Sequence, residues 1–117
     1  LMLAVITTFM SGVKVKSRDS ARMLHVDALV TALNLYATDN GQFPPISTDT
    51  TLTGEDAVST ALKNSGAISE IPLDPTYPQQ NYTYVSNSSG STYTITFCLE
   101  TDSIQGREIG CSNTITP

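Results

Sequence analysis

The chain has 117 residues and a formal net charge of −5, from 11 acidic and 6 basic residues with a single histidine. This length suits one domain with a modest core, and the acidic balance argues against electrostatic binding of nucleic acid by the folded part. Residues 1–25 carry four basic and one acidic residue (net +3), and the remainder carry two basic and ten acidic residues (net −8). The sequence therefore predicts a basic neck under an acidic head.

The first segment, residues 1–10, reads LMLAVITTFM and is apolar on every side of a helix, as in lipid or a protein interior. The uncharged run ends at Val13, whereas a membrane-spanning helix needs about 20 apolar residues. No basic residues precede the run, so it does not read as a signal peptide. We expect the chain to start partway along a membrane helix. Residues 1–13 would be the C-terminal half of a hydrophobic membrane or filament-core helix, and residues 14–117 a globular head that includes the rest of the long helix.

Residues 17–45 predict the exposed half of one long helix and its end. Apolar residues recur at spacings of three and four, which gives one apolar stripe for the head to pack on. Asp39, Asn40 and Gly41 favour a turn, and Pro44-Pro45 prevents the helix from resuming. The stripe consists of Val26, Leu29, Ala32, Leu33 and Tyr36.

The rest of the head predicts a short helix and then strands. Thr53 is the expected cap of the short helix, with Glu55 and Asp56 in its first turn. Two alternating runs, residues 81–86 and 91–98, predict a hairpin with a turn at residues 87–90, and residues 107–117 predict a third strand. If Ser86 pairs with Ser91, one face of the hairpin carries Tyr82, Tyr84, Tyr93, Ile95 and Phe97.

The segment after the hydrophobic run resembles type IV pilins and type II secretion major pseudopilins. The resemblance extends to Pro45, and beyond it only the general plan matches; no position here matches the family's N-terminal aromatic residue or its nearby glutamate. It implies an α+β, pilin-like fold: a long N-terminal helix packed against a short second helix and an antiparallel sheet of about three strands. The residues that carry it are, in order, Arg18-Asp19-Ser20-Ala21-Arg22, Ala32-Leu33, Tyr36, Asp39-Asn40-Gly41 and Phe43-Pro44.

The resemblance implies a structural subunit, not an enzyme, that polymerises through its hydrophobic helix into an extracellular filament, either a type IV pilus or a pseudopilus. The expected partners are copies of itself, the inner-membrane assembly machinery and prepilin peptidase. The chain would sit in the membrane before assembly and at the cell surface afterwards. The alternative is a membrane-anchored extracytoplasmic binding module, or a minor adhesive or DNA-uptake pilin.

Assembly is expected to use the apolar segment and the basic neck. Lys14, Arg18 and Arg22 are spaced four apart on the predicted helix, where like charges repel. We expect this basic stripe to face acidic head residues of a neighbouring copy; the alternative is a solvated neck. The full set of expected assembly residues is Leu1, Leu3, Ala4, Val5, Ile6, Phe9, Lys14, Arg18 and Arg22.

Cys98 and Cys111 predict a disulfide, favoured over two unpaired thiols by the even cysteine count and the exported class of protein that the chain resembles. Two cysteines and His25 are too few for a zinc site, and His25 alone is expected to be a surface or packing residue. No motif for a catalytic nucleophile or a phosphate-binding loop occurs, so no catalytic or cofactor-binding residue is predicted.

Loop carboxylates raise calcium as an alternative, because some pseudopilins bind calcium in a loop of the sheet. Solvated carboxylates are the favoured interpretation, since no regularly spaced ligand series is present. The calcium candidates are Asp74, Glu100 and Asp102. Asn81 and Asn87 match the glycosylation acceptor pattern, which is frequent by chance.

Overall fold

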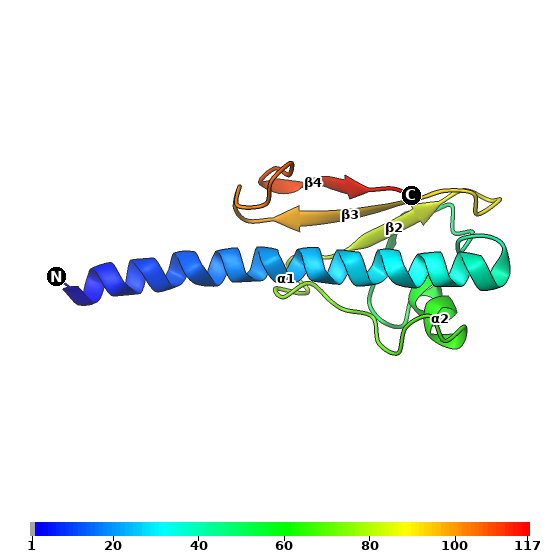
Figure 1. Cartoon of the computed structure of the whole chain (residues 1–117), viewed down its shortest axis with the longest axis horizontal. Coiled ribbons are helices and arrows are strands. Elements are labelled where there is room, and N and C mark those ends of the chain that lie inside the picture. The colour runs from blue at the N-terminus through cyan, green and yellow to red at the C-terminus, as the bar shows by residue number, and fades with distance from the viewer. Residues whose placement is uncertain (1) are drawn as a thin grey trace.

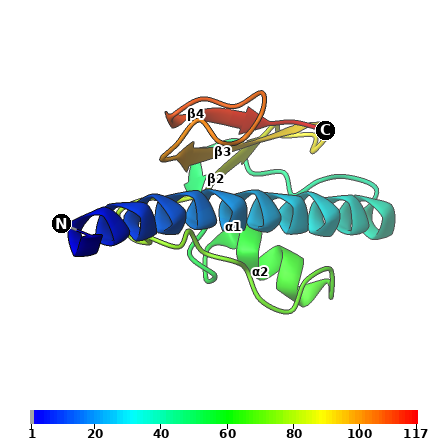
Figure 2. The same ribbon diagram turned by 60° about the vertical axis from the view of Figure 1, so that its left-hand side comes forward.

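The computed structural model describes the backbone of residues 2–117 and the side chains of residues 14–117. One long helix organises the α+β fold: a sheet covers one side of it and a short helix lies on the opposite side (Figure 1). The N-terminal part of the long helix extends past the end of the sheet in both views (Figures 1 and 2). The elements are α1 (Met2–Asn40), β1 (Thr50–Thr51), α2 (Ala57–Asn64), β2 (Thr83–Ser86), β3 (Tyr93–Leu99) and β4 (Gly110–Ile115).

The predicted apolar stripe of α1 is confirmed as the centre of the core. Val26, Leu29, Ala32 and Leu33 are at most 1% exposed, and Tyr36 is partly buried against them. The helix also ends where predicted. Gly41 has φ +79° and donates its N–H to the Ala37 carbonyl at 2.7 Å, because glycine takes this left-handed conformation without strain.

Within residues 2–117 the sheet has four antiparallel strands in the order β1-β2-β3-β4, so the expectation of about three strands is too low. The additional strand is β1, two residues of the proline- and threonine-rich connector, which carries no strand-like alternation. Leu52 holds it: its side chain is buried, and its N–H donates to the Tyr82 carbonyl at 2.9 Å. The predicted third strand is confirmed as β4.

The hairpin is confirmed, but its expected register is wrong by two residues. Ser86 pairs with Tyr93 and not with Ser91, because the connecting loop spans residues 87–92. Asn87 closes this loop by accepting the Ser91 N–H at its side-chain oxygen (2.9 Å). Since side chains alternate with period two, a shift of two residues leaves each on its expected face. The buried face is therefore as predicted: Tyr82, Tyr84, Tyr93, Ile95 and Phe97 are at most 1% exposed.

The short helix begins later than predicted. Its N-cap is Asp56, not Thr53, and the Asp56 carboxylate accepts the Ser59 N–H at 3.1 Å. Thr53 lies outside the helix, where its own N–H donates to Asp56 at 2.9 Å. Aspartate outcompetes threonine here because its charge also complements the positive end of the helix dipole.

Gly90 is the glycine whose replacement should disturb the head. Its φ is +65°, and a Cβ built there overlaps the Phe43 carbonyl oxygen, while the Gly90 carbonyl accepts the Phe43 N–H at 2.9 Å. Gly66 is a matched control, with φ +79° and open space around its Cβ position. We expect Gly66→Ala to lower the free energy of unfolding by about 1–2 kcal/mol from backbone strain alone. Gly90→Ala should cost about 2–3 kcal/mol, because the connector must also move. Equal losses in urea denaturation would contradict this close approach.

Candidate functional site

The main polar feature of the described side chains is a partly buried ion cluster between α1 and the loops of the head, which we define as Arg18, Asp19, Arg22, Asp74 and Glu100. Arg22 is its centre and is fully buried. It forms a bidentate pair with Asp74, with distances of 2.9 Å from Nε and 3.0 Å from Nη2. Its Nη1 donates to Asp19 (2.8 Å) and to Glu100 (2.7 Å), and Nη2 donates also to Thr76 Oγ1 (3.2 Å). Because a guanidinium has five N–H donors, every donor of Arg22 is used.

Asp19 ties the same helix to the loop that follows β3. One carboxylate oxygen accepts the Glu100 N–H at 2.9 Å, in addition to the bond from Arg22. The other oxygen accepts both the N–H and the hydroxyl of Thr101, at 2.8 and 2.5 Å. Each oxygen therefore has two donors, which satisfies a carboxylate buried away from water.

Arg18 completes the cluster at its more exposed side. Its guanidinium makes a bidentate pair with Glu100, with distances of 2.7 and 2.8 Å. The acidic partners of Arg18 and Arg22 thus lie in the same chain, so our expectation that these arginines find their partners in a neighbouring copy is wrong. The helix meets loops that lie 52 to 82 residues later in the sequence, and these contacts pair the charges of both arginines within the chain. Lys14 is exposed to solvent.

The cluster keeps its acids ionised. Hydrogen bonds from Arg18, together with those from Arg22, lower the pKa of Glu100 to about 2. Burial pushes the pKa of Asp74 upward, but its bonds from Arg22 and Thr76 outweigh this, and its pKa falls below the ordinary value. Burial likewise opposes ionisation of Asp19, whose pKa is lowered overall by the N–H of Glu100 and by Thr101. The same carboxylates raise the pKa of Arg22 against its burial.

These shifts predict stability that is lost in acid. A carboxyl group whose pKa is lower in the folded state contributes stability that is complete above its ordinary pKa, which is 4.5 for Glu100. That contribution disappears as the pH falls to about 2. Burial lowers the pKa of His25, so protonation of this residue begins to reduce the stability of the fold once the pH drops below its ordinary pKa of 6.5. We expect the melting temperature to fall slightly below that pH and steeply below pH 4.5. The difference between the wild type and Glu100→Gln should vanish near pH 2; an unchanged difference there would contradict the assignment.

The calcium candidates are not available as a ligand set. Asp74 and Glu100 both bond to the Arg22 guanidinium, which uses both oxygens of Asp74 and one oxygen of Glu100, and Arg18 bonds the other oxygen of Glu100. Asp102 is exposed and lies outside the ion cluster. Among the described side chains, no group of three or more His, Cys, Asp or Glu residues is arranged to hold a metal ion. We therefore do not propose calcium binding at these residues.

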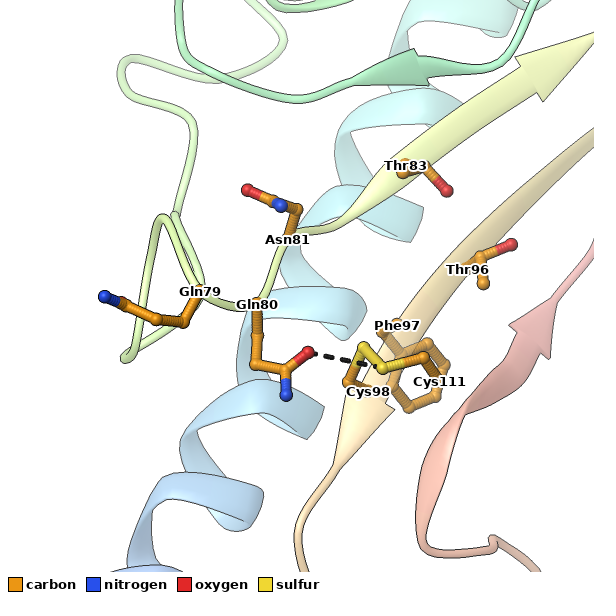
Figure 3. A pocket seen from close by; sticks show the side chains of 8 residues that line it. All are labelled: Gln79, Gln80, Asn81, Thr83, Thr96, Phe97, Cys98 and Cys111. Carbon is orange, nitrogen blue, oxygen red and sulfur yellow. Dashed lines mark hydrogen bonds between the residues drawn. A yellow bond between two sulfur atoms is a disulfide. The ribbon is translucent and has the colours of Figure 1, made fainter.

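The disulfide between Cys98 and Cys111 is confirmed, with an S–S distance of 2.06 Å (Figure 3). It joins β3 to β4 where their register shifts between Phe97 and Leu99. The bond therefore holds together two strands at the point where their hydrogen-bond ladder is irregular.

The remaining candidates are distributed over the head. Asn81 lies just before β2 and is partly buried, and Asn87 lies in the hairpin loop with its Nδ2 donating to Ser91 Oγ at 2.7 Å. His25 is partly buried on α1, with Nδ1 2.8 Å from the Tyr82 hydroxyl, as expected for a packing residue.

The expected assembly residues Leu1, Leu3, Ala4, Val5, Ile6 and Phe9 lie outside the described side chains. Over the described residues, α1 contains no stretch that is both long and apolar enough to cross a bilayer.

No protein-family model, curated protein or solved structure matches this chain.

The sequence indicates both arginines but not their partners. The spacing of Asp19 and Arg22, three residues apart on one helix, was the available signal for an ion pair. Thr76 and Thr101, which complete the hydrogen bonding, lie in loops without regular pattern, and no signal pointed to them.

Proposed function

We propose that this chain is a structural subunit of an extracellular helical filament of the type IV pilus or pseudopilus kind. The observation that carries the proposal is the projecting part of α1. This helix continues past the sheet with no other described element beside it (Figures 1 and 2). Its first ten residues are uncharged and mostly apolar. Such a helix is costly in water and needs either lipid or other helices around it.

The ion cluster supports this proposal because it fastens the helix to the head. Arg22, Asp19 and Arg18 all lie on α1 close to the point where the helix leaves the sheet, and they are bonded to loops of the head. A force applied along the projecting helix would therefore reach the sheet through charge-assisted hydrogen bonds as well as through the core. This attachment suits a subunit that carries load in a polymer.

The shape of the chain, a head with one projecting helix, also indicates how copies would assemble. The projecting helix of one copy contacts surfaces different from itself on its neighbours, and a contact of this heterologous kind that does not close gives an open helical polymer. In such a filament the apolar helices leave the lipid and pack on one another. Residues with small side chains, such as Ala4, favour close helix packing.

The test uses the full-length gene in the organism that encodes it. The ten residues of segment 1–10 are shuffled, which keeps their composition and hydropathy but changes the order of side chains. We expect the variant to insert in the membrane with a folded head and to form at least about tenfold fewer filaments, because packing between helices depends on side-chain order. The control is a shuffle of the exposed connector residues Ser47-Thr48-Asp49, which should leave filament number unchanged.

The outcomes separate the two main functions. If the shuffled segment supports normal filaments, the segment is not a packing contact. If no filaments form even from the wild-type gene while the chain stays in the membrane, the chain is a membrane-anchored extracytoplasmic module. Residues encoded upstream give an independent check: a short basic leader ending in glycine and a glutamate soon after it would support the filament family.

A further inference from the structure

A shallow groove of about 290 Å³ lies beside the disulfide, on the outward side of the sheet (Figure 3). It forms because pairing between β2 and β3 begins only at Thr83, opposite Thr96. The chain before Thr83 leaves the sheet, and the remaining space is bordered by residues 79–81 on one side and by the disulfide on the other. Thr83 and Thr96 are on the face opposite the buried tyrosines, so their side chains point away from α1.

The walls of the groove offer amides and hydroxyls. Gln79, Gln80 and Asn81 contribute carboxamides, and Thr83 and Thr96 contribute hydroxyls. None of the described lining residues carries a charge. An anion such as phosphate is disfavoured because no Arg or Lys lines the groove, and a hard cation is disfavoured because no carboxylate does.

These groups are available to a ligand. Among residues 14–117, the Thr83 and Thr96 hydroxyls and the Gln79 amide make no hydrogen bond to another side chain or to backbone. The Gln80 side chain points toward the disulfide, and its Oε1 lies 3.2 Å from Cys111 Sγ (Figure 3). A disulfide sulfur has no proton to donate, so this contact does not satisfy the Gln80 oxygen. The side-chain oxygen of Asn81 is also free, since only its Nδ2 is used, in a long 3.4 Å bond to Pro78.

We propose that this groove binds a neutral carbohydrate. Sugar hydroxyls both donate and accept hydrogen bonds, as do carboxamides and threonine hydroxyls, so the two sets are complementary. The disulfide and the threonine methyl groups provide apolar surface for the C–H groups of a sugar ring. Small-molecule sites have volumes of about 300–1,000 Å³, so this groove is at the lower limit of that range. Its volume suits a compact ligand better than an extended peptide. A filament subunit and an anchored module could both carry this site, so it does not depend on the proposed function.

The test is an NMR titration of the isotopically labelled chain in detergent micelles. The probes are the methyl glycosides of glucose, galactose, mannose and N-acetylglucosamine, each raised to millimolar concentrations. We expect at least one of them to cause saturable shifts in the amide signals of Gln80, Thr83 and Thr96. Thr96→Val should weaken that binding about tenfold, because it removes one hydroxyl and keeps the shape and strand preference of the side chain.

Thr114→Val is the matched control. Thr114 pairs directly with Thr96 across β3 and β4 but does not line the groove, so this variant should bind the sugar like the wild type. Gln80→Ala gives a second lining variant at a position outside the strands, and it too should weaken binding. The proposal is overturned if none of the four glycosides gives saturable shifts, if the control weakens binding as much as Thr96→Val, or if a neutral tripeptide such as Ala-Ser-Ala binds more tightly than every sugar.

Discussion

Arg22→Met is expected to lower the free energy of unfolding of the chain by about 3–5 kcal/mol, or to prevent the head from folding. Methionine fills a similar volume but leaves the buried carboxylates of Asp19 and Asp74 without their cation. The cost therefore comes mainly from unpaired buried charge rather than from a cavity. Urea denaturation followed by the near-ultraviolet signal of the buried tyrosines measures it.

Two further variants identify the cause of that loss. Arg18→Met is the matched control: its side chain is 30% exposed and pairs with Glu100, which is 27% exposed, so we expect a loss of about 1 kcal/mol or less. Adding Asp74→Asn to Arg22→Met should recover part of the stability, because it removes one of the two buried carboxylates left without a cation. If both arginine variants lose the same stability, or if the second substitution recovers none, burial of the cluster is not what makes Arg22 important.

Replacing Cys98 and Cys111 together by serine should lower the free energy of unfolding by about 3 kcal/mol, since the bond closes a loop between residues 13 apart. For a domain of this size that corresponds to a fall of about 10–20 °C in melting temperature. The loss should be large because residues 100–109 contribute little to the core: Ile104 is only partly buried, and Ile109 is 65% exposed. β4 depends on β3 and the disulfide for its attachment.

The reduced wild type provides the check on the double variant. Treatment with a thiol reductant should lower the melting temperature by a similar amount and should have no effect on the serine variant. Mass measurement without reductant should show the oxidised chain lighter by two hydrogen atoms. A serine variant as stable as the oxidised wild type would contradict a structural role for the bond.

The sequence alone determined which sides of the long helix and of the hairpin are buried, and where the long helix ends. The three- and four-residue spacing of Val26, Leu29 and Leu33 predicted the buried side of α1, since periodicity needs no knowledge of the partner. Gly41 predicted the end of that helix for the same local reason. Alternation in the hairpin predicted which tyrosines are buried, even though the register was wrong, because an error of two residues preserves the face.

Only the tertiary structure decided the features that depend on distant residues. Arg22 reaches Asp74 across 52 residues and Glu100 across 78, and no local pattern indicates which loop carboxylate will lie beside a given arginine. The sequence therefore suggests partners in a neighbouring copy for the whole basic stripe, whereas the partners of Arg18 and Arg22 lie in the same chain. β1 was missed because two residues cannot show a period, and its pairing depends on where Leu52 is buried. The hairpin loop also contacts the connector, where the Phe43 N–H donates to the Gly90 carbonyl at 2.9 Å, and only the folded chain brings these two segments together.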